Sequence, residues 1–115
     1  MKNYYERVRS TRVYEVVRES PIDSMALLSN RIGNEVLLKR EDIQTVFSFK
    51  LRGAYNKLCQ LSEIQRRSGV VAASAGNHAQ GVAMAARSLG IEATIVMPET
   101  TPQIKLDAVR FWGVN

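Results

Sequence analysis

The sequence predicts an α/β protein with an open, mainly parallel sheet and helices on both faces, incomplete within this chain. Three observations favour this fold. Short apolar runs at residues 35–39, 69–73 and 93–97 alternate with segments that carry apolar residues at helical spacing. A strand–helix–strand order implies parallel strands joined by right-handed crossovers. The runs are almost continuously apolar, which is typical of strands buried on both faces.

Residues 1–34 are expected to form a helical lead-in. Residues 1–20 favour a helix, and its candidate inward side chains are Tyr5, Val8, Val13, Val16 and Val17. The Ser20-Pro21 pair should end it, because proline restricts the residue before it. A second, short helix is expected from Asp23 to Arg31, with a turn at Gly33-Asn34.

Residues 35–115 are expected to repeat strand and helix. The strand at 35–39 precedes a helix over 48–61, and the strand at 69–73 precedes a helix over 77–89 that ends at Gly90. The strand at 93–97 precedes a helix that begins with a threonine cap in Thr100-Thr101 and an early proline. The inward residues of the three helices are, in order, Leu51, Ala54, Tyr55 and Leu58; Ala79, Val82, Ala83, Ala86 and Leu89; Ile104, Ala108, Val109 and Trp112.

The composition, 45% hydrophobic and 23% charged, suits a soluble domain. No apolar run approaches the roughly 20 residues of a membrane span, and the first residues lack the apolar core of a secretion signal. The one cysteine, Cys59, is expected to be a packing residue in a reducing, cytoplasmic compartment. The basic residues behind the net charge of +5 are dispersed, so neither nucleic acid nor membrane is an expected partner.

Residues 48–54 read Ser-Phe-Lys-Leu-Arg-Gly-Ala and place Lys50 at the start of an amphipathic helix. The helix dipole and partial desolvation would make its amine nucleophilic toward a carbonyl. A solvated helix lysine is the ordinary alternative. Phe49 offers a face for a flat ring, and Gly53 inside a helix indicates close approach of another surface. Arg52 is expected to form a structural ion pair.

The segment Ser74-Ala75-Gly76-Asn77-His78 lies where a strand runs into a helix. Free N–H groups and the helix dipole favour an anion there, and ligands of open α/β sheets bind outside the carboxyl ends of the strands. Ser74 can donate its hydroxyl, Gly76 lets the backbone approach closely, and Asn77 can donate to a ring oxygen. An ordinary helix cap by Ser74 or Asn77 explains the pattern equally well.

Two further features have ordinary explanations. His78, the only histidine, has no metal-ligand spacing around it, so no metal site is expected and packing is its simpler role. The Lys39-Arg40-Glu41-Asp42 segment is typical of a solvated loop, although it follows a strand and would lie near the proposed site.

The chain carries neither a dinucleotide-binding glycine motif nor a P-loop, which argues against a nucleotide enzyme.

The Ser-Phe-Lys-Leu-Arg-Gly-Ala motif around Lys50 resembles the cofactor-lysine signature of the serine/threonine dehydratase family. These are pyridoxal 5′-phosphate (PLP) enzymes related in fold to the tryptophan synthase β subunit. The resemblance runs from about Tyr5 to Gly113, and within the family the biosynthetic threonine dehydratases are most similar. It is also carried by Lys39–Asp42, Ser74–Gly81, Val96–Pro98, Lys105–Arg110 and Arg12–Tyr14.

The resemblance implies a role for each matched position. Lys50 would hold PLP as a Schiff base and take the substrate α-proton. Asn77 would donate to the 3′-oxygen of the pyridine ring, and Phe49 would pack on that ring. The loop that grips the substrate carboxylate would be Ser74, Ala75, Gly76, Asn77 and His78. The implied enzyme is a cytoplasmic, homo-oligomeric lyase that converts L-threonine into 2-oxobutanoate and ammonia, the first step of isoleucine biosynthesis.

The same resemblance implies that residues 1–115 are the N-terminal part of a fold type II catalytic domain. The family's glycine-rich phosphate loop, its partner for the pyridine nitrogen and its isoleucine-sensing region are expected after residue 115. We therefore expect this chain alone to be inactive. Ser20-Pro21 and Thr45 depart from the family's usual Thr-Pro and proline. Two alternatives remain open. The chain could belong to a serine dehydratase or serine racemase of the same fold, or it could be a non-catalytic fragment.

Overall fold

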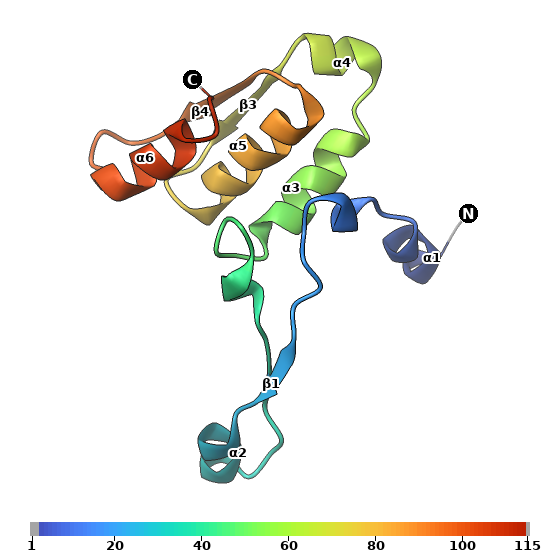
Figure 1. Ribbon diagram of the computed structural model, residues 1–115, viewed down its shortest axis with the longest axis vertical. Helices are drawn as coiled ribbons and strands as arrows, with labels where there is room; N and C mark the ends of the chain where they lie inside the picture. Colours follow the sequence, from blue (N-terminus) through green and yellow to red (C-terminus); the bar gives the residue numbers. More distant parts are fainter. Residues whose placement is uncertain (1–2, 115) are drawn as a thin grey trace.

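The computed structural model describes residues 3–114, which form a body and a projecting arm (Figure 1). The body holds the strands β3 (Val70–Ala73) and β4 (Ala93–Val96) and the helices α3 (Lys50–Cys59), α5 (Asn77–Leu89) and α6 (Gln103–Arg110). The arm, residues 21–40, holds β1 (Ile22–Ser24), α2 (Ala26–Ile32) and β2 (Leu37–Lys39). The shorter elements are α1 (Tyr4–Arg9), α4 (Glu63–Arg67) and the 3-10 turns η1 (Val13–Glu15) and η2 (Glu41–Ile43).

A parallel strand pair with its crossover helix confirms the predicted α/β class. β3 pairs with β4 in parallel from Val70 opposite Ala93 to Ala73 opposite Val96, and α5 connects the two strands. One face of the pair packs on the helices, where Ile95 is buried. On the other face Val71 and Val96 are 75% and 55% exposed. Within residues 3–114, therefore, helices cover one face of this sheet and not both.

Helices α3 and α5 lie side by side with their N-terminal ends on the same side of the body (Figure 1). The helical spacing correctly predicted the buried face of each, namely Leu51, Ala54, Tyr55 and Leu58 on α3 and Ala79, Val82, Ala83 and Ala86 on α5. Leu89 is half-buried against the same core. Gly90 ends α5 in the left-handed conformation, at φ 63°, as predicted.

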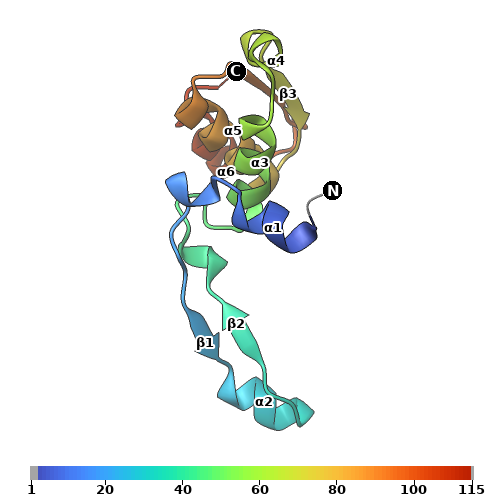
Figure 2. The ribbon, with the colours of Figure 1, turned by 90° about the vertical axis from the view of Figure 1, so that its right-hand side faces the viewer.

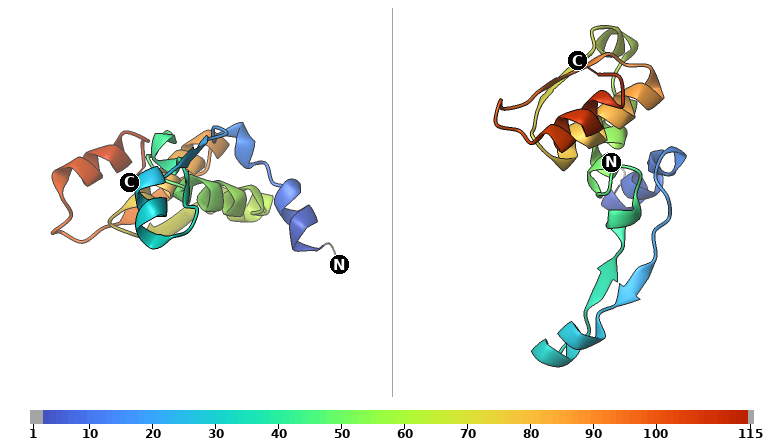
Figure 3. Two further views of the ribbon diagram at one scale, coloured as in Figure 1. Left: turned by 90° about the horizontal axis from the view of Figure 1, so that it is seen from below. Right: turned by 60° about the vertical axis from the view of Figure 1, so that its left-hand side comes forward.

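The arm corrects the prediction for the first strand. Residues 37–39 do form a strand, but it pairs antiparallel with β1, with Asp23 opposite Leu38, and takes no part in the parallel sheet. The sequence does not predict β1, because its three residues follow a proline and include Asp23 and Ser24, which favour turns. Figure 2 shows the arm extending away from the body with α2 at its far end, and Figure 3 shows its two strands side by side.

Polar contacts join the two chain segments at the base of the arm. The Gln44 side chain is 1% exposed and donates from Nε2 to the Arg18 carbonyl at 2.8 Å. Its Oε1 accepts from the Arg18 N–H at 3.0 Å. These two bonds join the incoming and outgoing segments of the arm in the way that a strand pair would.

The predicted helix over residues 1–20 is wrong in length. Helix α1 ends at Arg9, because the Ser10 and Thr11 hydroxyls donate to backbone carbonyls one turn back and compete with the helix. Of the predicted inward residues, two are exposed and three are buried or half-buried, namely Tyr5 and Val8, then Val13, Val16 and Val17. Residues 1, 2 and 115 lie outside the described part of the chain.

Helix α6 begins without the predicted threonine cap. Its N-cap is Pro102, and the buried Thr101 hydroxyl has no hydrogen-bond partner among residues 3–114. Val109 is buried as predicted, whereas Ile104 is 75% exposed and that prediction is wrong. Ala108 and Trp112 are half-buried. Over the same described range, no helix has both the length and the apolar character that a membrane crossing requires.

Candidate active site

Lys50 is the first residue of α3, and its side chain faces solvent. Ser48, which is buried, accepts the Lys50 N–H on its hydroxyl at 3.4 Å. The next residue, Leu51, is 0% exposed and anchors the helix start in the core. The Lys50 Nζ lies 5.3 Å from the centroid of the Phe49 ring, which is itself 59% exposed. The amine and the ring therefore lie next to each other. Both are exposed within residues 3–114, so the prediction that Lys50 is partly desolvated is wrong for the described part of the chain.

Gly81 brings α5 into contact with the start of α3. A Cβ added to Gly81 would lie 3.1 Å from the Lys50 carbonyl carbon and 3.2 Å from the Leu51 nitrogen, so only glycine lets the two backbones approach this closely. Asn77, the first residue of α5, lies about one helical turn before Gly81. The contact thus holds the backbone of Lys50 near the N-terminal end of α5.

The sequence pointed to the wrong glycine for this contact. Gly53 was predicted to meet another surface, yet a Cβ added there would have no neighbour within 4 Å. Gly81 also lies inside a helix, and the same energetic cost of glycine in a helix would have singled it out. The two positions are indistinguishable from the sequence, because only the packing of α5 on α3 decides which one is crowded.

The first turn of α5 has no side-chain cap. Its N-cap is Gly76, whose backbone (φ −138°, ψ −143°) turns the chain out of β3 into the helix. The Ser74 hydroxyl accepts from the Gly76 N–H at 3.4 Å and does not reach the helix. Ala75, Asn77 and His78 are exposed, and an added Cβ at Gly76 would meet nothing within 4 Å. The interpretation of this segment as an ordinary helix cap by Ser74 or Asn77 is therefore wrong. The first N–H groups of α5 are accessible and can bind an anion.

The charged segment after β2 supplies an ion pair to α3 through Glu41. The Arg52 guanidinium donates to Glu41 through Nε at 2.9 Å and Nη2 at 2.8 Å, which confirms the predicted ion pair of Arg52. The Ser20 hydroxyl donates to the same carboxylate at 2.7 Å. Hydrogen bonding from Arg52 lowers the pKa of Glu41 to about 2. This bidentate pair joins the base of the arm to α3 half a turn beyond Lys50.

A second polar contact joins the N-terminal segment to α3. The Tyr55 hydroxyl donates to Glu15 at 2.6 Å, and Glu15 also accepts from Arg12. Burial of Tyr55, followed by this hydrogen bond, raises the pKa of its hydroxyl. Hydrogen bonding from Arg12, and then from Tyr55, lowers the pKa of Glu15.

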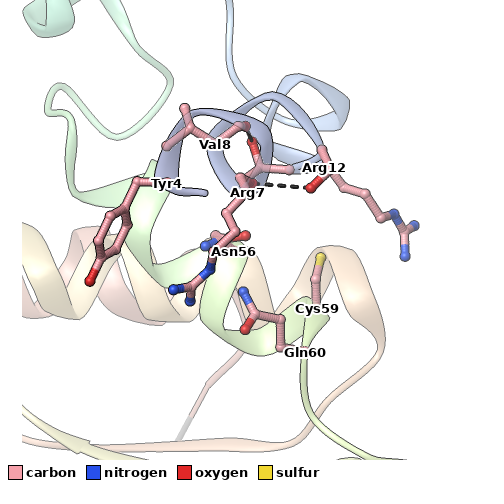
Figure 4. Close-up of a pocket in the computed structure, with 9 residues that line it drawn as sticks. Tyr4, Arg7, Val8, Arg12, Asn56, Cys59 and Gln60 are labelled. Carbon is pink, nitrogen blue, oxygen red and sulfur yellow. Dashed lines mark hydrogen bonds between the residues drawn. The ribbon is translucent and has the colours of Figure 1, made fainter. Parts of the chain in front are cut away.

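A pocket of about 410 Å³ lies between α1 and α3, away from Lys50 (Figure 4). Its lining includes Arg7, Arg12, Asn56 and Gln60, and none of the predicted site residues. Cys59 also lines it, half-buried against the core, in keeping with a packing role. The candidate site residues Lys50 and Phe49 are thus exposed, and the Gly81 contact holds the Lys50 backbone near the first turns of α5.

Comparison with known proteins places this chain in a family. Residues 13–115 match the family described as pyridoxal-phosphate dependent enzyme. A protein named biosynthetic L-threonine dehydratase from Pasteurella multocida is 58% identical over 110 residues, which are 96% of this chain and 21% of that protein. Mitochondrial threonine dehydratase from Saccharomyces cerevisiae is 56% identical over 111 residues, 96% of this chain and 19% of that protein. The chain therefore spans about a fifth of the length of these relatives.

Solved structures show the same relation. Threonine deaminase isoform 2 from Solanum lycopersicum superposes with a TM-score of 0.88 at 54% identity, over 96% of this chain and 32% of that one. Serine racemase from maize superposes with a TM-score of 0.84 at 36% identity, over 90% of this chain and 32% of that one.

Proposed function

Because the chain belongs to the pyridoxal-phosphate dependent enzyme family, we propose that it carries the lysine-bearing segment of a threonine dehydratase. The proposed reaction converts L-threonine into 2-oxobutanoate and ammonia. One observation carries the choice of substrate, namely that identity is 54% to a solved threonine deaminase and 36% to a solved serine racemase.

The residues at the candidate site fit PLP, and we propose that Lys50 holds it. The Lys50 amine is exposed and accessible to a carbonyl, and the Phe49 ring beside it offers a face for the cofactor ring. When bound, PLP supplies an electron sink for the negative charge that develops on the substrate α-carbon. Lys50 would then be placed to take the α-proton, and Asn77 would be the residue that donates a hydrogen bond to the 3′-oxygen of the ring. The Gly81 contact supports this pairing, since it keeps the start of α5 next to Lys50.

The loop Ser74–His78 is proposed to bind the substrate carboxylate. The first N–H groups of α5 lack a side-chain cap, and the positive end of the helix dipole favours a negative charge there. Ser74 and Asn77 add a hydroxyl and an amide as donors, and Gly76 leaves room for the ligand. His78 and Ala75 contribute backbone groups to this loop. Fixing the carboxylate here would orient the α-proton toward Lys50.

The test uses a chimera in which this chain replaces the matching 110 residues of the P. multocida enzyme. The chimera should form 2-oxobutanoate from L-threonine, whereas the 115-residue chain alone should form none. The Lys50→Ala chimera should lose activity by more than about 10²-fold, because it lacks both the cofactor anchor and the base. Lys57→Ala, an exposed lysine on the same helix, is the matched control and should leave activity unchanged. Full turnover by the Lys50→Ala chimera would reject the assignment.

A serine racemase activity is the second candidate, favoured by the TM-score of 0.84 to the maize enzyme. The same chimera incubated with L-serine distinguishes the two, because a racemase gives D-serine and a dehydratase gives pyruvate. A cytoplasmic location and a homo-oligomeric complete enzyme belong to this proposal as well. Size-exclusion chromatography of the chimera with light scattering tests the second of these.

A further inference from the structure

The pocket between α1 and α3 is lined by positive charge and, within residues 3–114, by no acidic side chain. Its nine lining residues include Arg7 and Arg12 and neither aspartate nor glutamate. Its volume of about 410 Å³ falls in the usual range of small-molecule sites. A pocket lined by one sign of charge raises the local concentration of ligands of the opposite sign. This pocket therefore favours an anion.

Only one of the two arginines is already engaged by a carboxylate. Arg12 donates to Glu15 through Nε at 2.6 Å and Nη2 at 2.8 Å. The side chains of Arg7, Asn56 and Gln60 make neither an ion pair nor a hydrogen bond within residues 3–114, although all three line the pocket. Asn56 is half-buried, so its amide is partly withdrawn from water without a protein partner in return. A ligand can therefore use one guanidinium and two amides.

These three groups come from two elements and converge on one side of α3. Asn56 and Gln60 are four residues apart, at the end of α3, so they lie one above the other. The guanidinium carbon of Arg7 lies 5.4 Å from the centroid of the Tyr4 ring, and this cation–π contact restricts its position. Figure 4 shows the Arg7 side chain pointing from α1 toward α3, with the two amides beside it.

The chemistry of these groups specifies the class of ligand. A guanidinium presents a planar fork of N–H donors that matches two oxygens of a carboxylate or a phosphate. Side-chain amides add N–H donors to the same oxygens. We propose that this pocket binds a small oxoanion, a carboxylate or a phosphate group, with Arg7 as its charged partner and Asn56 and Gln60 as further donors. The pocket shares no residue with the candidate active site, so this inference is independent of the proposed reaction.

The first test titrates the 115-residue chain with sodium phosphate and, separately, with sodium acetate. Sodium chloride at equal ionic strength is the reference. The side-chain amide signals of Asn56 and Gln60 in proton–nitrogen NMR spectra should shift and saturate, with a Kd below about 10 mM. Tighter binding of phosphate would identify a phosphate ligand, and tighter binding of acetate a carboxylate. Shifts that chloride reproduces, or that do not saturate with either anion, would overturn the proposal.

A matched pair of arginines separates a specific contact from net charge. Arg7→Gln should raise the Kd at least about tenfold, because it removes the charged fork from the pocket. Arg9→Gln removes a charge from the same helix, where Arg9 lies over the Tyr5 ring at 5.6 Å and does not line the pocket. It should leave the Kd unchanged within about twofold. Equal weakening by the two variants would overturn the proposal.

The second test asks whether the pocket stays open in a complete catalytic domain. The chimera described above, loaded with PLP, is titrated by calorimetry with the anion that binds the chain more tightly. Arg7→Gln should weaken binding to the chimera at least about tenfold, as in the chain. A folded chimera whose anion binding is the same with and without Arg7→Gln would overturn the proposal. Because turnover is not measured, an inactive chimera that passes this test would reject the proposed reaction and still support the oxoanion site.

Discussion

The body and the arm place the same kind of side chain in opposite surroundings. Leu51 on α3 is 0% exposed, whereas Leu27 on α2 is 88% exposed. Both lie in helices bounded by short loops, so secondary structure does not explain the difference. Leu51 is buried because α5 lies against α3, while α2 lies at the far end of the arm (Figure 2). The body is thus organised around its own helix pair, and the arm presents apolar side chains outward.

The largest expected effect comes from truncating the two leucines. Leu51→Ala should lower the free energy of unfolding by about 2–5 kcal/mol, through lost burial and the cavity that remains. Leu27→Ala, the matched control in the arm, should change it by less than about 0.5 kcal/mol. Urea unfolding of the 115-residue chain, followed by circular dichroism, measures both. Equal losses would mean that the arm packs in solution as the body does, which would remove the contrast.

Exchanging the two helix glycines for alanine sharpens the contrast inside the body. Gly81→Ala places a methyl group 3.1 Å from the Lys50 backbone, which cannot move aside cheaply, and should destabilise the fold by about 1–3 kcal/mol. Gly53→Ala meets open space and should stabilise it by about 0.5–1 kcal/mol, because alanine favours a helix. The same urea titration gives both values. Stabilisation by Gly81→Ala would show that the helices do not touch at Lys50.

The helix faces were predictable because they depend on local spacing. Residues 51 to 58 and 79 to 86 carry their apolar side chains every third or fourth position, and one partner helix is enough to bury each stripe. The corner from β3 into α5 was predictable for the same reason, since strand, small loop and helix follow one another directly. These local patterns also placed Lys50 at a helix start and Ser74–His78 before one.

The errors in the arm and at the candidate site depend on contacts between distant segments. The antiparallel pairing of Leu38 with Asp23 needs a three-residue strand that has no signal of its own. The exposure of Lys50 depends on what covers the site and not on its helix. For the Glu41–Arg52 pair, the sequence predicted that Arg52 forms an ion pair but did not identify its partner, because the chain offers several acidic residues.

A smaller effect is expected from the ion pair that joins the two regions. Glu41→Gln removes a carboxylate that is 13% exposed and accepts from Arg52 and Ser20, and should cost about 1–2 kcal/mol at neutral pH. Glu63→Gln removes an ion pair with Arg67 in which both side chains are at least 77% exposed, and should cost less than about 0.5 kcal/mol. Similar losses of unfolding free energy in the two variants would mean that the Glu41–Arg52 pair is as exposed to solvent as the Glu63–Arg67 pair.

The pH dependence of this difference follows from the pKa of Glu41. Hydrogen bonding from Arg52 lowers that pKa from 4.5 to about 2, so the folded chain binds the proton less readily than the unfolded chain does. The stabilisation is therefore fully present above pH 4.5 and is lost as the pH falls toward 2. The gap in unfolding free energy between the wild-type chain and Glu41→Gln should shrink over this window, as measured by urea titrations at a series of pH values. A gap that stays constant down to pH 2 would show that the carboxylate has no charged partner.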